Sequence, residues 1–201
     1  MKYNLSDITI RIMDIMHSSS VDGTGFRDVL FVNYCPHRCE GCHNPKTWDR
    51  ANGKDVTLKE VYDDLMESSF TNVTFSGGEP FEQSKELYIL ARANKEGGKT
   101  KWIYSDYTFE QIMADEDKKN LLSVCDVLVD GRFDKNKTEL NLKFKGSTNQ
   151  RIIDIPKTLK KGEVVLFDDT FIHSTLLIQL RTPKYHLLSI FERNSTFFNK
   201  K

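Results

Sequence analysis

Three cysteines fall within eight residues of one another, in the segment CPHRCEGC. Thiolates favour soft metal centres, and Cys35, Cys39 and Cys42 are close enough in sequence to wrap a single one. A zinc ion would need a fourth ligand, which His37 or His43 could supply. A four-iron cluster usually takes four thiolates, so three would leave one iron open to a ligand from outside the chain. The spacing alone predicts a metal centre and leaves zinc and iron–sulfur open.

The fourth cysteine, Cys125, stands apart in the segment SVCDVLVD. In a strand it would share a face with Val127 and Val129, which predicts a small buried side chain rather than a metal ligand. One tight group and one outlier are also unlike a secreted disulfide framework. In a reducing, cytoplasmic compartment, the cysteine pattern therefore favours metal binding or redox chemistry.

A double glycine closes another predicted strand, in the segment SGGEP. Gly77 and Gly78 would let backbone approach a ligand closely, just before the amino terminus of a helix that Pro80 suits. The plain alternative is a tight turn from strand to helix. Because the turn follows the strand next after the cysteine segment, we expect the two to lie close together.

Polar side chains close two further predicted strands. Ser105, with Asp106 and Tyr107, follows one strand, and Asp130 and Arg132 follow the next. Parallel α/β sheets and barrels place their sites at the carboxyl ends of their strands. The alternative for these positions is a surface turn with an ordinary ion pair.

Strands and helices alternate along most of the chain. Short β-branched and aromatic runs predict strands, and apolar residues at helical spacing predict helices, one of them capped by Thr57 with Glu60. The strands are expected at 8–16, 28–34, 72–76, 101–105 and 124–130, and the helices at 57–66, 80–95 and 109–122. Strand followed by helix, repeated, predicts parallel βα units, with connections too long for hairpins.

The motifs in this order resemble the radical S-adenosylmethionine superfamily, in which a CPHRCEGC-type loop and a GGEP-type turn occur together. More narrowly, the chain from about Ile8 to Ile155 is similar to the activating enzymes of anaerobic (class III) ribonucleoside-triphosphate reductase. The segments that carry this resemblance are DGTGFRDVLFVNYCPHRCEGCHNPKTWD, TFSGGEPF, IYSDYTFEQI, DVLVDGRF and GSTNQRIID.

The resemblance implies two cofactors, a 4Fe-4S cluster and S-adenosylmethionine. It makes Cys35, Cys39 and Cys42 the cluster ligands, with S-adenosylmethionine on the fourth iron. Residues implied to bind the cofactors are Gly41, Cys42, His43, Gly77, Gly78, Glu79, Ser105, Asp130 and Arg132. Within this set, Gly78 would meet the ammonium, Arg132 the carboxylate and Asp130 a ribose hydroxyl, while His43 either stacks on adenine or is a solvated loop residue.

The resemblance also implies an oxidoreductase reaction. An external donor such as flavodoxin reduces the cluster, S-adenosylmethionine is cleaved reductively, and the 5′-deoxyadenosyl radical takes hydrogen from a glycine of the reductase. No catalytic side chain is expected beyond the cluster and bound S-adenosylmethionine. The alternatives are a pyruvate formate-lyase activase or 7-carboxy-7-deazaguanine synthase, against which DVLVDGRF and GSTNQRIID argue, and a non-catalytic metal-binding module.

The fold expected for residues 1–155 is a partial (β/α)6 barrel of the radical S-adenosylmethionine type, in the α/β class. A closed eight-fold barrel needs about 250 residues, and an open side would admit a loop of the partner protein. Residues 156–201 read as a β-rich C-terminal extension of open role, which either packs on the body or docks the reductase.

Composition excludes several other classes of protein. The 29 Lys and Arg residues balance 29 Asp and Glu residues, so no bulk charge predicts a nucleic-acid partner. No apolar run approaches the ~18 residues that would span a bilayer. The first residues interrupt their apolar positions with Asp and Arg, unlike a signal peptide. We therefore expect a cytoplasmic protein with no membrane or nucleic-acid partner.

Overall fold

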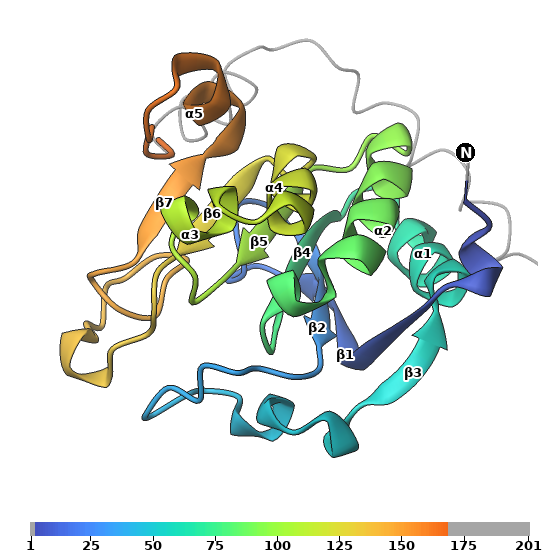
Figure 1. Cartoon of the computed structure of the whole chain (residues 1–201), viewed down its shortest axis with the longest axis horizontal. Coiled ribbons are helices and arrows are strands. Elements are labelled where there is room, and N and C mark those ends of the chain that lie inside the picture. Colours follow the sequence, from blue (N-terminus) through green and yellow to red (C-terminus); the bar gives the residue numbers. More distant parts are fainter. Residues whose placement is uncertain (1–2, 169–201) are drawn as a thin grey trace, which may run out of the picture. The chain divides into compact units, whose positions relative to one another are not determined.

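A single mixed sheet organises the computed structural model, which describes residues 3–168 (Figure 1). Its strand order is β3-β1-β2-β4-β5-β6-β7, and it is not closed into a barrel. The strands are β1 (Thr9–Ser19), β2 (Arg27–Val32), β3 (Lys54–Thr57), β4 (Asn72–Gly77), β5 (Lys101–Tyr104), β6 (Val127–Asp130) and β7 (Arg151–Asp154). The open α/β sheet expected from the sequence is confirmed.

Strand direction differs in part from the six parallel units expected. The central strands β2, β4, β5 and β6 are parallel, whereas β1 pairs antiparallel with both β2 and β3, and β7 pairs antiparallel with β6. The connection from β1 to β2 is only seven residues long, and Gly23 and Gly25 adopt positive φ angles of 128° and 74° in it. Such a link returns the chain beside the strand it left, because a parallel neighbour needs a longer crossover.

Helices cover one face of the sheet (Figure 1). These are α1 (Leu58–Glu67), α2 (Ser84–Glu96), α3 (Phe109–Met113) and α4 (Glu116–Ser123). The capping box of Thr57 and Glu60 is present at the start of α1, as the sequence predicts. The core between the two layers is fully buried and includes Leu30, Phe75, Leu87, Ile103 and Leu128. Among residues 3–168, no helix has both the length and the apolar character needed to cross a membrane.

The opposite face is filled by a buried guanidinium and a tryptophan. Arg27 is 1% exposed, and its Nε donates to Thr74 Oγ1 at 2.7 Å. Its guanidinium lies 5.6 Å from the centre of the Trp102 ring, which packs edge-on against Phe144 and Phe167. Burial lowers the pKa of Arg27 to about 10. This packing covers the part of that face near the amino ends of β2 and β5.

A helix that the sequence analysis did not predict, α5 (Ile155–Lys161), follows β7. Asp154 caps it, Pro156 occupies its first turn and Gly162 ends it at φ 74°, a sequence pattern typical of helix boundaries. Beyond it, the amide of Phe167 donates to the carbonyl of Ile152 at 2.8 Å. The described residues up to Phe167 form one compact unit. The strand-like runs STLLIQL and HLLSIF lie outside the described residues, so the extension from residue 156 stays a prediction.

Candidate functional site

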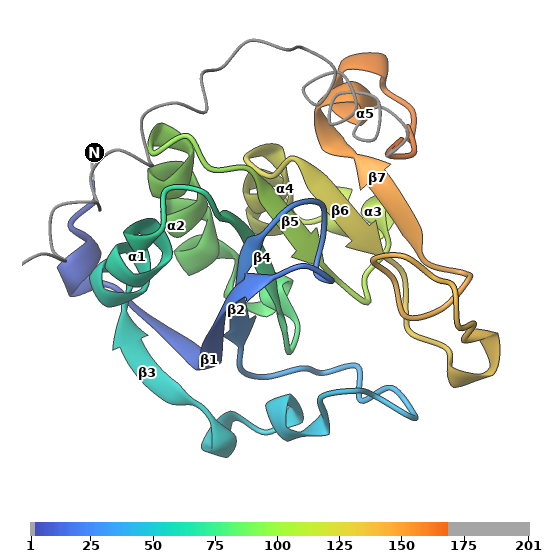
Figure 2. The ribbon, with the colours of Figure 1, turned by 180° about the vertical axis from the view of Figure 1, so that it is seen from behind.

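A cavity of about 410 Å³ opens at the carboxyl ends of the parallel strands. Its lining includes residues from the chain segment after β2 and from the segment between β6 and β7. Both segments lie beyond the carboxyl ends of the parallel strands (Figure 2). The residues from the sequence analysis that line the cavity are Cys35, Cys39, Cys42, His43, Gly77, Gly78, Ser105 and Asp106. The cysteine loop and the glycine turn, 35 residues apart at their nearest, therefore share one site.

The cysteine loop is anchored where it leaves the sheet. Tyr34, at φ 84°, donates its amide to the carbonyl of Thr47 at 2.7 Å. Within the loop, the amide of Cys42 donates to the carbonyl of Cys39 at 3.1 Å, and Gly41 adopts a φ of 75°. Gly41 does not line the cavity; a Cβ there would lie 3.1 Å from the side chain of Lys135. Contact of Gly41 with S-adenosylmethionine stays a prediction.

Two of the three thiols are strongly shielded from water. Burial raises the pKa of the Cys35 thiol to about 11, and burial together with a hydrogen bond to Asp106 raises that of Cys39 to about 11. Buried thiolates need a cationic partner, which a metal centre supplies when it replaces the protons. Within residues 3–168, no three Cys, His, Asp or Glu side chains are placed to hold a single metal ion. A cluster binds each thiolate at a different iron, so three thiols around one cavity fit that group.

The glycine turn is shaped by the neighbouring strand rather than by open space. A Cβ at Gly78 would lie 2.2 Å from the Tyr34 carbonyl oxygen, and one at Gly77 would lie 2.7 Å from backbone atoms of Phe31 and Val32. The amide of Gly78 donates to the Val32 carbonyl at 2.8 Å. Both glycines are therefore required for close packing of β4 on the chain that leads into the cysteine loop. Backbone contact with an ammonium at Gly78 stays a prediction.

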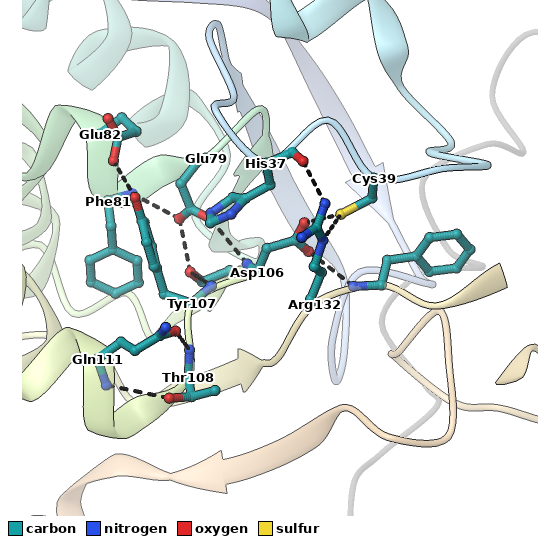
Figure 3. Close-up of polar contacts among 12 residues, drawn as sticks. His37, Cys39, Glu79, Phe81, Glu82, Asp106, Tyr107, Thr108, Gln111 and Arg132 are labelled. Carbon is teal, nitrogen blue, oxygen red and sulfur yellow. Dashed lines mark hydrogen bonds and ion pairs between the residues drawn. The ribbon is translucent and has the colours of Figure 1, made fainter. Parts of the chain in front are cut away.

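Glu79 directly follows the lining residue Gly78 and joins three segments (Figure 3). Its carboxylate is 1% exposed and accepts hydrogen bonds from His37 Nε2 at 3.1 Å, Ser105 Oγ at 2.9 Å and the Asp106 amide at 3.0 Å. Burial acts to lower the pKa of His37, but the hydrogen bond and charge of Glu79 outweigh it and raise that pKa. Glu79 therefore holds the surrounding segments together without lining the cavity itself.

Arg132 reaches the site through the cysteine loop. Its Nε lies 3.3 Å from Cys39 Sγ, and its Nη2 donates to the carbonyl of His37 at 2.8 Å. At the same sulfur, Asp106 Oδ2 accepts from Cys39 at 2.6 Å. Arg132 is not among the residues that line the cavity, so the structure places it against a predicted metal ligand instead of in the space for S-adenosylmethionine.

Asp130 is held in an ion pair away from the cavity lining. It is 1% exposed, and both of its oxygens are engaged: Oδ1 accepts from Arg151 Nε at 3.0 Å, and Oδ2 accepts from the Phe109 amide at 2.7 Å and from Arg151 Nη2 at 2.5 Å. The structure therefore favours the ordinary ion pair over the ribose contact, the two alternatives that the sequence leaves open at Asp130.

Replacing Arg151 with Met should lower the free energy of unfolding by about 3 kcal/mol, because the buried Asp130 carboxylate would lose its partner. Urea unfolding under reducing conditions measures this change. The matched control is Glu110→Gln, since Glu110 is the exposed partner of the same guanidinium and should cost less than about 1 kcal/mol. Equal losses in the two variants would contradict a structural role for the buried pair.

Several lining residues were not predicted from the sequence. Phe31 and Tyr104 line the cavity from the sheet, Asp22 from the link between β1 and β2, and Phe133 and Phe144 from the segment before β7. The motif GSTNQRIID gives a signal for that segment, because Asn149 and Gln150, within it, bond to the carbonyls of the turn after β6. The His43 ring lies 5.0 Å from the ring of Phe133, so this predicted residue contributes to an aromatic side of the cavity.

Cys125 is buried in the helix-side core, 3% exposed, and its Sγ donates to the Leu121 carbonyl at 3.4 Å. Burial raises the pKa of this thiol to about 12. The predicted burial is confirmed, but the predicted face is wrong. Cys125 precedes β6 and packs in the cluster with Leu128, whereas Val127 and Val129 pack on the other side around Trp102.

Comparisons with known proteins agree with an iron–sulfur site. Residues 21–153 match a family described as a 4Fe-4S single cluster domain. Two relatives are named "anaerobic ribonucleoside-triphosphate reductase-activating protein": that of enterobacteria phage T4 is 37% identical over 142 residues (66% of this chain, 86% of the relative), and that of Escherichia coli K12 is 30% identical over 139 residues (65% and 89%). The solved structure of QueE from Escherichia coli overlaps 52% of this chain and 55% of its own, at 16% identity and a TM-score of 0.45.

Proposed function

Because the chain belongs to the family of anaerobic ribonucleoside-triphosphate reductase-activating proteins, we propose that it generates the glycyl radical of such a reductase. The observation that carries this proposal is that three thiols and the Gly77–Gly78 turn line a single cavity. Cys35, Cys39 and Cys42 would hold a 4Fe-4S cluster there, which would supply the electron for reductive cleavage of S-adenosylmethionine to methionine and a 5′-deoxyadenosyl radical; transfer of a hydrogen atom from a glycine of the reductase would then give 5′-deoxyadenosine and the glycyl radical.

The chain's own residues have holding and shielding roles in this reaction. Cys35, Cys39 and Cys42 would hold the cluster, and Gly77 and Gly78 would present backbone to the S-adenosylmethionine beside it. The buried sides of the cavity keep water from the reacting groups. No side chain has to move a proton, because the reaction consists of one electron transfer and one hydrogen-atom transfer.

The remaining contacts to S-adenosylmethionine are proposed from the cavity lining. Ser105 and His43 line the cavity and are proposed to contact S-adenosylmethionine there. Glu79, Asp130 and Arg132 lie outside the lining and support the site through their hydrogen bonds. Phe133, next to His43, adds an aromatic surface on which an adenine ring would pack.

The partners follow from the same proposal. The reductase is the protein substrate, and the electron comes from an external one-electron donor such as flavodoxin. Free cysteines at all four positions suit a cytoplasmic, reducing compartment. We retain residues 156–201 as a C-terminal extension with no role assigned.

The test is anaerobic reconstitution of the full chain with iron and sulfide, followed by S-adenosylmethionine, a reductant and the anaerobic reductase from the same genome. We expect 5′-deoxyadenosine by chromatography and a glycyl-radical doublet on the reductase by electron paramagnetic resonance. Pyruvate formate-lyase serves as the control substrate protein. Cleavage of S-adenosylmethionine with radical formation on pyruvate formate-lyase, and none on the reductase, would contradict the proposal.

A further inference from the structure

We propose that Arg132 is a positioning residue that hydrogen-bonds the sulfur of Cys39 and thereby raises the reduction potential of the cluster that Cys39 would hold. This inference rests on the proposed function only in requiring a cluster at the three thiols. It differs from the role in binding the carboxylate of S-adenosylmethionine that the resemblance implies for Arg132.

The geometry of the guanidinium carries the inference (Figure 3). Nε lies 3.3 Å from Cys39 Sγ, and Nη2 is fixed by the His37 carbonyl at 2.8 Å, so the same group grips the loop at two points. Cys39 is 4% exposed. The sulfur end of this hydrogen bond is buried, whereas Arg132 itself is exposed, so water screens part of its charge.

The backbone of Arg132 is fixed as well. Asn149 Nδ2 donates to the carbonyl of Arg132 at 2.9 Å, and Gln150 Nε2 donates to that of Gly131 at 2.9 Å. Gly131 takes a φ of 97°, which turns the chain after β6 toward the cysteine loop. The turn therefore holds the Arg132 guanidinium against the Cys39 sulfur in a defined orientation.

The guanidinium approaches that sulfur from outside the cavity. Cys39 lines the cavity, but Arg132 does not; it borders a separate surface depression together with Glu40 and Lys135. A residue whose task was to grip S-adenosylmethionine would have to enter the cavity. One that adjusts a cluster ligand needs only to reach the sulfur.

The direction of the effect follows from charge. Reduction adds one electron to the cluster without making or breaking a bond, and an external donor supplies that electron. A positively charged donor at a ligand sulfur stabilises the more negative, reduced form and so raises the potential. Asp106 lies on the same sulfur with the opposite charge, so its neutralisation should move the potential upward.

The test compares reconstituted full-length variants in the absence of both S-adenosylmethionine and reductase. The midpoint potential of the cluster is measured by mediated titration, followed by electron paramagnetic resonance, with iron content measured in parallel. We expect Arg132→Met to shift the midpoint to more negative values, Arg132→Lys to shift it less, and Asp106→Asn to shift it to more positive values. Lys135→Met is the matched control, because it removes a nearby positive charge that pairs with Glu40 and does not touch a sulfur.

A second measurement separates this inference from the carboxylate role. Binding of S-adenosylmethionine is titrated against the same variants. A wild-type midpoint in iron-replete Arg132→Met would overturn the inference, and if binding were weakened as well, it would restore Arg132 as the carboxylate partner. If Arg132→Met fails to hold iron, Arg132→Gln, which also removes the charge, decides the matter by the same criterion. Since no reductase is present, the outcome is independent of whether the wild-type chain activates one.

Discussion

Alanine at Cys35, Cys39 or Cys42 is expected to remove nearly all of the iron that the reconstituted chain binds, lowering it from about four atoms per chain to a small fraction of that number. Each thiol lines the same cavity, and within residues 3–168 the remaining cysteine lies in the core. The broad visible absorption of the cluster should disappear, and formation of 5′-deoxyadenosine should fall to background. Iron analysis and absorption spectra of the anaerobic variants measure the loss.

Cys125→Ala is the control that gives this prediction its force. Removing a buried sulfur should lower the free energy of unfolding by about 1–2 kcal/mol through a small cavity, while iron content stays at the wild-type level. A folded Cys125→Ala variant without iron would show that the cluster takes four protein ligands. The open iron on which the proposed chemistry depends would then be lost.

Gly78→Ala is expected to disturb the site although it adds a single methyl group. The new Cβ would lie 2.2 Å from the Tyr34 carbonyl oxygen, and this backbone leads directly into Cys35. Overpacking of this kind costs about 1–3 kcal/mol, and relief would displace the start of the cysteine loop. We expect lower stability in urea and less than half of the wild-type iron content.

Gly97→Ala provides the matched control. There the nearest neighbour of a Cβ is the terminal methyl of Met66 at 2.4 Å, the mobile end of a flexible side chain. This variant should keep its iron and most of its stability. Full iron content in Gly78→Ala would show that the loop tolerates movement of Tyr34; it would then favour the simpler idea that Gly78 only leaves room for S-adenosylmethionine.

The cysteine loop and the glycine turn could be predicted because their signals are local in the sequence. Cysteine spacing and the double glycine are signals contained within a few residues, and both survive intact in the structure. The helix caps at Thr57 and the strands β2, β4, β5 and β6 are likewise encoded in short windows of sequence. These features depend little on what the rest of the chain does.

Distant partners explain what the sequence analysis missed. Asp130 and Arg132 are two residues apart and looked like one polar group, yet one pairs with Arg151 and the other with Cys39, 93 residues away. The strands β3 (KDVT) and β7 (RIID) are as short as β5 (KWIY) and β6 (VLVD), but they contain fewer apolar residues, so their sequence signal for a strand is weaker. By contrast, α5 could have been found, because Pro156 and Gly162 mark its two ends.

The buried carboxylate of Glu79 has a consequence for the order in which the protein matures. Its partners His37, Ser105 and Asp106 lie 42, 26 and 27 residues away along the chain, so the contacts form only once the segments after β2, β4 and β5 have come together. Contacts between distant residues form late in folding. The thiol loop is therefore set in place by the finished fold, unlike a zinc finger, in which the metal itself drives folding. Iron delivery to the newly made chain should accordingly follow folding, and mutations far from the loop that slow assembly of the sheet should delay cluster insertion.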